Sequence, residues 1–177
     1  MVRTAVRAVT SRMVRFFSML RPHLGGLLIG SALWLMACSK DYIPNTDLED
    51  TEENRKVVSF CEEYRRAVEL RNVGLLLKLA HSRYYEDGGN IDTSDDLDRA
   101  GLEEYLQGKF RDATALRYEI RYRRITKGRK GELFVDYTYS ASYKIPTEQG
   151  DMWRRTVADN RLEITPKGDS YMILAGM

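Results

Sequence analysis

Apolar side chains recur at spacings of three and four from Glu52 onward, with charged residues on the opposite side. This period is typical of a helix that buries one face. The residues of that face are Val57, Phe60, Cys61, Tyr64 and Val68. Asn72 and Gly74 interrupt the pattern, and the apolar run Leu75–Ala80 follows. The pattern therefore predicts a long amphipathic helix and then a short helix that is buried.

The next segment combines a short strand with a third helix. Arg83–Gly89 lacks the helical period, which predicts a short strand that ends in a turn at its two glycines. Thr93 and Ser94 can cap a helix, and the acids after them suit the positive end of a helix dipole. We therefore expect the third helix to run from these residues to Phe110.

Beyond Arg111 the apolar residues alternate with polar ones, which is the period of a half-buried strand. The predicted strands cover Leu116–Tyr122, Leu133–Ile145, Met152–Ile164 and Tyr171–Gly176. Helices that precede long, one-sided strands favour an α+β domain, in which the three helices cover one face of the sheet.

The first 37 residues differ in composition from the rest. They hold five of the 28 lysines and arginines, none of the 26 acids, and the apolar run Leu24–Ala37. These 14 apolar or small residues are fewer than the roughly 20 that span a membrane. A basic segment followed by a short apolar one predicts an export signal. The remaining 140 residues carry a net charge of −3, which excludes a basic nucleic-acid-binding class, so no nucleic acid partner is expected.

The motif Leu35–Cys38 (LMAC) resembles the lipobox of bacterial lipoproteins. The resemblance implies that residues 1–37 are a lipoprotein signal peptide and that Cys38 carries the lipid, which makes the membrane a partner. Residues 38–51 are polar and aperiodic, so they are expected to form a lipidated flexible tether. Ser39 at the position after the cysteine implies, by the enteric sorting rule, the periplasmic face of the outer membrane. An uncleaved membrane anchor is the alternative.

The order of the elements over residues 52–177 resembles the NTF2-like (SnoaL-like) superfamily. Three local patterns support the resemblance, namely Tyr64–Val73, Tyr84–Asp87 and Asn160–Ile164. The family implies an NTF2-like cone, in which three N-terminal helices pack on a strongly bent, mostly antiparallel sheet around a central pocket. The chain as a whole resembles small NTF2-like lipoproteins of Gram-negative bacteria.

Ketosteroid isomerase belongs to this superfamily, and its pattern suggests candidate catalytic residues. By this resemblance Tyr64 falls at the tyrosine that donates to an oxyanion, and Asp87 falls at the general base. The place of the second, protonated acid is held by Asn160, an amide with no proton to tune. The structural alternatives are that Tyr64 is a core residue and that Asp87 belongs to a turn.

Tyrosines project from the predicted strands on the same side as leucine and valine, and such a wall suits a semi-polar ligand. The pocket candidates are Tyr64, Tyr118, Tyr122, Tyr137, Tyr139 and Trp153. The same side chains could equally fill a core or form the interface of a homodimer. The sequence leaves the three uses open.

Other reactive groups are few after removal of the signal. Cys61 lies on the apolar helical face, which predicts a buried thiol. His81 is the one remaining histidine, so neither a metal site nor a cofactor is predicted. The basic run Arg121–Lys130 is expected to be a solvated hairpin edge, with anionic lipid as the alternative partner.

The function expected from these observations is a non-catalytic domain that binds a small ligand or a partner while tethered to the outer membrane. One alternative is an isomerase-like or dehydratase-like enzyme that uses Tyr64 and Asp87. The other is a structural homodimer without a ligand.

Overall fold

A computed structural model describes residues 40–88, 93, 94 and 96–177. The predicted signal peptide and Cys38 lie outside the described residues. Lys40–Met177 forms one compact unit. Within the described ranges, none of the helices has the length and apolar character needed to cross a membrane.

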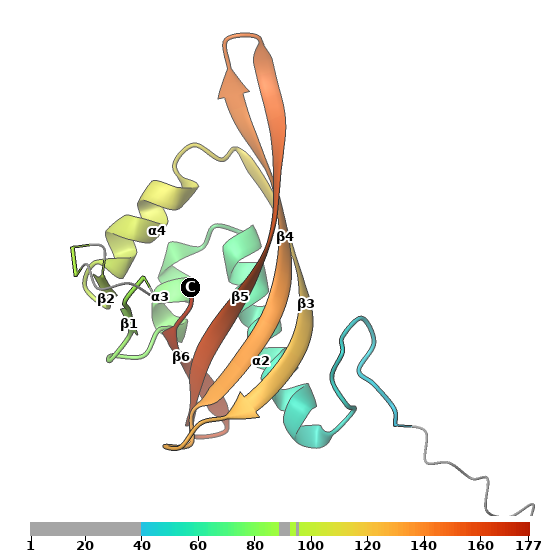
Figure 1. Cartoon of the computed structure of the whole chain (residues 1–177). Helices are drawn as coiled ribbons and strands as arrows, with labels where there is room; N and C mark the ends of the chain where they lie inside the picture. The colour runs from blue at the N-terminus through green and yellow to red at the C-terminus, as the bar shows by residue number, and fades with distance from the viewer. Residues whose placement is uncertain (1–39, 89–92, 95) are drawn as a thin grey trace, which may run out of the picture. The chain divides into compact units, whose positions relative to one another are not determined.

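The described chain runs from helices into strands, in the order that the hydrophobic periods predict (Figure 1). The elements are α2 (Glu52–Glu69), α3 (Val73–Leu79), β1 (Tyr85–Glu86), β2 (Leu97–Asp98), α4 (Leu102–Phe110), β3 (Ala115–Lys127), β4 (Leu133–Thr147), β5 (Gly150–Lys167) and β6 (Ser170–Ala175).

The four long strands pair in chain order, β3-β4-β5-β6, and every pair is antiparallel. In Figure 1 the strands curve, and α2, α3 and α4 lie on one side of the sheet. Helix α2 contacts both β3 and β6, so it lies across the covered face. The domain is therefore α+β with three helices on a bent antiparallel sheet, as the sequence predicts.

The apolar stripe of α2 lies in the core. Thr51 caps the helix, since its hydroxyl accepts a hydrogen bond from the Asn54 amide at 3.1 Å. Val57, Cys61 and Tyr64 are at most 3% exposed. The same core includes residues of β4, β5 and β6, namely Leu133, Val135, Tyr137, Leu162, Ile164 and Ile173.

The third helix begins later than predicted. Leu97 and Asp98 form strand β2, which pairs with β1, and α4 starts only at Leu102. The Asp98 carboxylate accepts hydrogen bonds from the backbone amides of Ala100 and Gly101, at 3.0 and 2.8 Å. Asp98 therefore supplies the local turn before the helix, and the hydroxyl pair at Thr93 and Ser94 does not begin it.

The predicted tether over Lys40–Thr51 packs against the domain instead, which corrects that expectation for these residues. Leu48 is only 5% exposed and belongs to the core. The Asp47 carboxylate contacts Arg121 at 2.7 Å and Arg123 at 2.9 Å on β3. Ile43 and Leu48 are five residues apart in a polar segment and leave no periodic signal, so the sequence pattern did not reveal this contact.

Strands β4 and β5 extend beyond the rest of the sheet as a hairpin, which projects from the upper end of the domain in Figure 1. Strand β3 begins at Ala115, opposite Lys144, so β4 continues past it. On the other side, β6 pairs with β5 only from Glu163 onward. The hairpin, defined here as Ala141–Ala158, pairs with β3 only through Ala141–Lys144 and does not pair with β6.

Candidate functional site

Three of the tyrosines predicted to line a pocket meet at the centre of the domain. Tyr64 comes from α2, Tyr118 from β3 and Tyr137 from β4, and they are 3%, 7% and 1% exposed. The Tyr64 hydroxyl lies close enough to those of Tyr118 and Tyr137 for the three groups to influence one another's pKa. We call these three residues the tyrosine cluster.

Burial controls the acidity of the cluster. It raises the pKa of Tyr118 to about 12, and it raises the pKa of Tyr64 and of Tyr137 further above the usual value. Ionising a phenol here would leave a charge in the core, so the three side chains stay neutral. Among the described residues, no buried side-chain nitrogen or oxygen lacks a hydrogen-bond partner.

Asn160 joins the cluster from β5. Its amide nitrogen donates to the Tyr137 hydroxyl at 3.1 Å and to the Gly176 carbonyl at 3.2 Å. Asn160 lies opposite Tyr137 in the sheet register, which puts both side chains on the covered face. The neutral amide thus ties the cluster to the residues that follow β6.

Asp87 does not lie with these buried residues. Tyr84 is 2% exposed, whereas Asp87 lies on the surface. The neighbouring acid, Glu86, is half-buried, and its carboxylate accepts a hydrogen bond from the Gly176 amide. Alternation along a strand places Glu86 on the same side as Tyr84 and turns Asp87 away. The phase of this alternation was the signal that could have pointed to Glu86.

The other two candidate tyrosines have different environments. The Tyr122 hydroxyl donates to Glu62 at 2.9 Å, and burial raises its pKa above the usual value. Tyr139 is half-buried, with its ring centroid 5.4 Å from that of Tyr118. Tyr139 therefore packs beside the tyrosine cluster, and Tyr122 belongs to a separate contact with α2.

Trp153 lies on the opposite face of the sheet, which corrects its place among the pocket candidates. It pairs in register with Lys144, and directly opposed residues share a face. Its ring is 48% exposed, and the guanidinium of Arg117 lies 5.3 Å from the ring centroid. Alternation along β5 puts Met152, and not Trp153, on the same face as the buried Ile164. The sequence pattern of β5 could therefore have placed Trp153 on the opposite face.

Comparison with solved structures identifies the fold. No protein-family model matches the sequence, and no curated protein matches it. Solved structures do match. A putative calcium/calmodulin-dependent protein kinase II association domain from Xanthomonas campestris has a TM-score of 0.56 at 13% identity, covering 78% of this chain and 91% of its own. A putative scytalone dehydratase from Novosphingobium aromaticivorans has a TM-score of 0.55 at 11% identity, covering 70% and 80%.

A ketosteroid isomerase-like protein from Erwinia carotovora atroseptica has a TM-score of 0.54 at 11% identity and covers 71% of this chain and 94% of its own. The domain has the NTF2-like fold. At these identities the likeness concerns the fold alone, so the residues of this chain must carry any statement about its chemistry.

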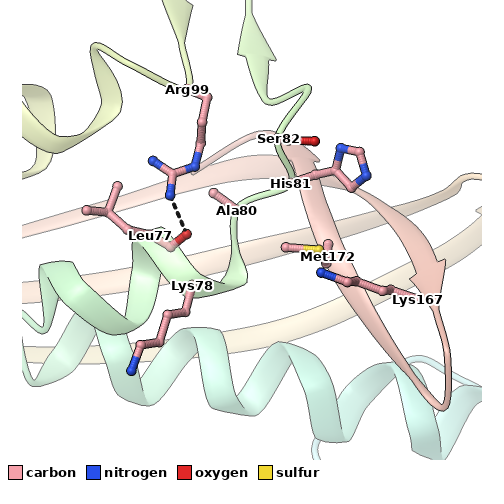
Figure 2. Close-up of a pocket in the computed structure, with 8 residues that line it drawn as sticks. All are labelled: Leu77, Lys78, Ala80, His81, Ser82, Arg99, Lys167 and Met172. Atoms are coloured by element: carbon pink, nitrogen blue, oxygen red, sulfur yellow. Dashed lines mark hydrogen bonds between the residues drawn. The ribbon is translucent and has the colours of Figure 1, made fainter.

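Within this NTF2-like domain, a surface cavity of about 480 Å³ lies between the end of α3 and β6 (Figure 2). It is lined by Leu77, Lys78, Ala80, His81, Ser82, Arg99, Lys167 and Met172. Figure 2 shows the Arg99 guanidinium on the Leu77 carbonyl, a 2.8 Å hydrogen bond, while Lys78 extends away from Lys167 and His81. The cationic groups do not converge on one point, and the end of a helix itself attracts such groups.

A second cavity, of about 550 Å³, lies along the middle of β3, β4 and β5. Three of its charged residues are paired with one another, while Arg123 pairs with Asp47 outside the cavity. The Asp136 carboxylate contacts Arg161 at 2.6 Å and Arg124 at 2.9 Å, and these cations lower its pKa. The NTF2-like domain thus has a bonded interior, an ion-paired sheet face and one projecting hairpin.

Proposed function

We propose that this chain is a lipid-anchored periplasmic protein whose NTF2-like domain binds a partner protein through the β4–β5 hairpin and catalyses no reaction. The observation that carries the proposal is a contrast in exposure. The tyrosine cluster inside the domain is buried, whereas apolar side chains on the hairpin are open to solvent.

The interior argues against the enzymatic alternative. An oxyanion donor must aim its hydroxyl at a space where substrate charge develops. Tyr64 is instead only 3% exposed, and its hydroxyl lies beside those of Tyr118 and Tyr137. Asp87, which would have to reach the same substrate, is at the surface. An enzyme built on this pair would need to break the cluster before each reaction.

The hairpin has the composition of an interface. Met152, Trp153 and Val157 are 41%, 48% and 57% exposed, although large apolar side chains usually avoid water. Tryptophan, methionine and arginine are enriched at protein interfaces, and β5 places Arg154 and Arg155 beside these residues. One protein of similar fold is named an association domain, which agrees with a role in assembly.

The lipid anchor is proposed from the lipobox-like motif Leu35–Cys38 alone. A diacylglyceryl group with an amide-linked chain, as bacterial lipoproteins carry, holds a protein stably because each buried methylene contributes about 0.8 kcal/mol. With Ser39 after the cysteine, we propose the inner face of the outer membrane as the location. A hairpin that projects from an anchored domain can reach a partner on or above that surface.

Site-specific photo-crosslinking tests the proposed binding surface. Benzoylphenylalanine replaces Trp153 on the hairpin or, as the matched control, the exposed Glu63 on α2, in cells of the source organism. We expect a discrete crosslinked protein at position 153 and none at 63. No adduct at position 153, or the same adducts at both positions, would contradict partner binding through the hairpin.

A further inference from the structure

We propose that the partner is a second copy of this chain, and that the two β5 strands pair antiparallel about a two-fold axis at Trp153. This inference rests on the proposed function, because it uses the same hairpin and names what binds it. Three observations carry it: an open strand edge, a self-complementary charge pattern and the position of β6.

The edge of β5 is open over much of its length. From Gly150 to Leu162 the strand pairs with β4 alone among the described residues. The backbone of Gly176 packs against Arg161, so the open edge ends at Asn160. Gly150–Asn160 contains neither proline nor lysine, the residues that most often protect an edge from pairing. Its outward amides and carbonyls are thus free to bond with another strand.

Pairing about Trp153 brings unlike charges together. In a two-fold antiparallel pair, residues at equal distances on either side of the axis oppose each other. Asp151 of each copy then faces Arg155 of the other, and the two Trp153 rings meet between these ion pairs. On the other face, Met152 opposes Arg154. No like charges oppose each other anywhere in the paired stretch from Gly150 to Thr156.

Two neighbouring registers are excluded because they place like charges opposite each other. An axis at Arg154 sets that guanidinium against its own copy, and like charges directly opposite are destabilising. An axis at Arg155 does the same, and it also sets Asp151 against Asp159. An axis at Met152 opposes no unlike charges at all. Among these registers, the one about Trp153 alone forms ion pairs without like-charge opposition.

Registers with the axis closer to Asn160 are excluded because the partner strand would overlap β6. An axis at Thr156 or Val157 would carry the partner's turn, Glu148–Gln149, alongside the β5 residues 163–166. Strand β6 already pairs with β5 there. The open edge therefore limits the overlap to the outer part of the hairpin, where the charges also match.

The resulting dimer has one sheet that continues from β3 and β4 through both β5 strands. The seven residues Gly150–Thr156 of each copy would form about six to eight backbone hydrogen bonds with the other copy. The Trp153 rings, now 48% exposed, would be covered, while Arg117 stays in place over each ring. The tyrosine cluster is untouched by this pairing.

Single cysteines test the register in the full chain. Trp153→Cys places the two thiols directly opposite each other, so oxidation is expected to give a disulfide-linked dimer. Val157→Cys is the matched control on the same strand and face, and it is 57% exposed. In the proposed register its two copies lie eight residues apart along the strand, about 27 Å, so no dimer is expected. Cys61 is fully buried and Cys38 carries the proposed lipid, so neither native thiol competes.

A charge swap tests the ion pairs independently. Asp151→Arg and Arg155→Asp should each raise the dimer dissociation constant of the full chain in detergent by about tenfold or more, through like-charge opposition. The double variant restores unlike pairs and should return to within about threefold of the parent. Because Lys144 contacts Asp151 within the same chain at 2.5 Å, the double variant also controls for the loss of that contact.

The outcomes separate this inference from the proposed function. A disulfide-linked dimer of Trp153→Cys but not of Val157→Cys, together with recovery in the double charge variant, supports the pairing. A disulfide-linked dimer of Val157→Cys, no dimer of either variant, or no recovery overturns it. A photo-crosslink from position 153 to a protein of another mass would overturn the self-pairing and leave partner binding intact.

Discussion

At the scale of single residues, the tyrosine cluster decides what the interior can do. Three buried phenols from three elements lie together, and the Asn160 amide donates to one of them, the Tyr137 hydroxyl. A buried polar group that loses its partner costs free energy, which makes such a network a fixed part of the core. The consequence can be tested one hydroxyl at a time.

Tyr137→Phe removes the hydroxyl that Asn160 contacts and should lower the free energy of unfolding by about 1–3 kcal/mol, because the Asn160 amide loses this partner and the buried hydroxyls of Tyr64 and Tyr118 lose a polar neighbour. Tyr139→Phe is the matched control, since Tyr139 is half-buried in the same strand and no hydrogen bond is described for its hydroxyl. Denaturant unfolding measures both. Equal changes in the two variants would contradict a bonded cluster.

The stability of the domain should fall in alkaline solution. The pKa values of Tyr64, Tyr118 and Tyr137 are raised in the folded protein, that of Tyr118 to about 12. Their contribution to stability is therefore complete below the unfolded value of about 10 and is lost as the pH rises through the folded values. Ultraviolet titration should show the three buried tyrosines ionising only above the range of a free phenol. A single midpoint for all tyrosines in the folded protein would contradict this.

The sequence predicted which tyrosines share a face, because alternation along a strand is a local property. It could not predict whether they surround a space or fill it, since that depends on how α2, β3 and β4 meet. Trp153 and Glu86 show a finer limit. To predict which face each of them lies on, the alternation must be counted from a residue known to be buried. An error of one residue in that count reverses the face.

At the scale of elements, the helices and strands follow their hydrophobic periods. The contacts of segments without such a period could not be predicted from the sequence. The start of α4 depends on one carboxylate, that of Asp98. The segment Lys40–Thr51 joins the domain through Leu48 and the ion pairs of Asp47. The start of α4 and the packing of Lys40–Thr51 each depend on one or two side chains. A hydrophobic period needs several residues, so it does not reveal such contacts.

Leu48→Ala should lower the free energy of unfolding by about 2–3 kcal/mol, the lower part of the range for buried leucines, if this segment is part of the core. Leu70→Ala is the matched control, because Leu70 is 71% exposed, and it should change the value by less than about 0.5 kcal/mol. Thermal or denaturant unfolding of the full chain measures the difference. No effect of Leu48→Ala would mean that the segment is a free tether after all.

At the scale of the whole molecule, the proposed anchor lies near one end of the sequence and the proposed binding surface lies nearer the other. The part from Asp41 to Asp112 has a net charge of −8, and the part from Ala113 to Met177 has a net charge of +4. The hairpin belongs to the second part. The charge pattern about Trp153 therefore lies in the half of the chain that is not dominated by acids.

Cys38→Ala should release the protein from membranes into the soluble periplasmic fraction, because the lipid is its proposed attachment. Labelling with an alkyne analogue of palmitate should mark the parent chain and not the variant. A variant that stays in the membrane fraction would instead support an uncleaved anchor formed by the apolar run Leu24–Ala37.

Native mass spectrometry of the full chain, released from membranes in detergent, tests the central claim most directly, because one spectrum reports copy number, lipid and retained ligand. The account predicts two copies, each beginning at a lipidated Cys38, with no small molecule held inside. A single chain that carries a small molecule in its interior would contradict both the closed tyrosine cluster and the paired hairpins.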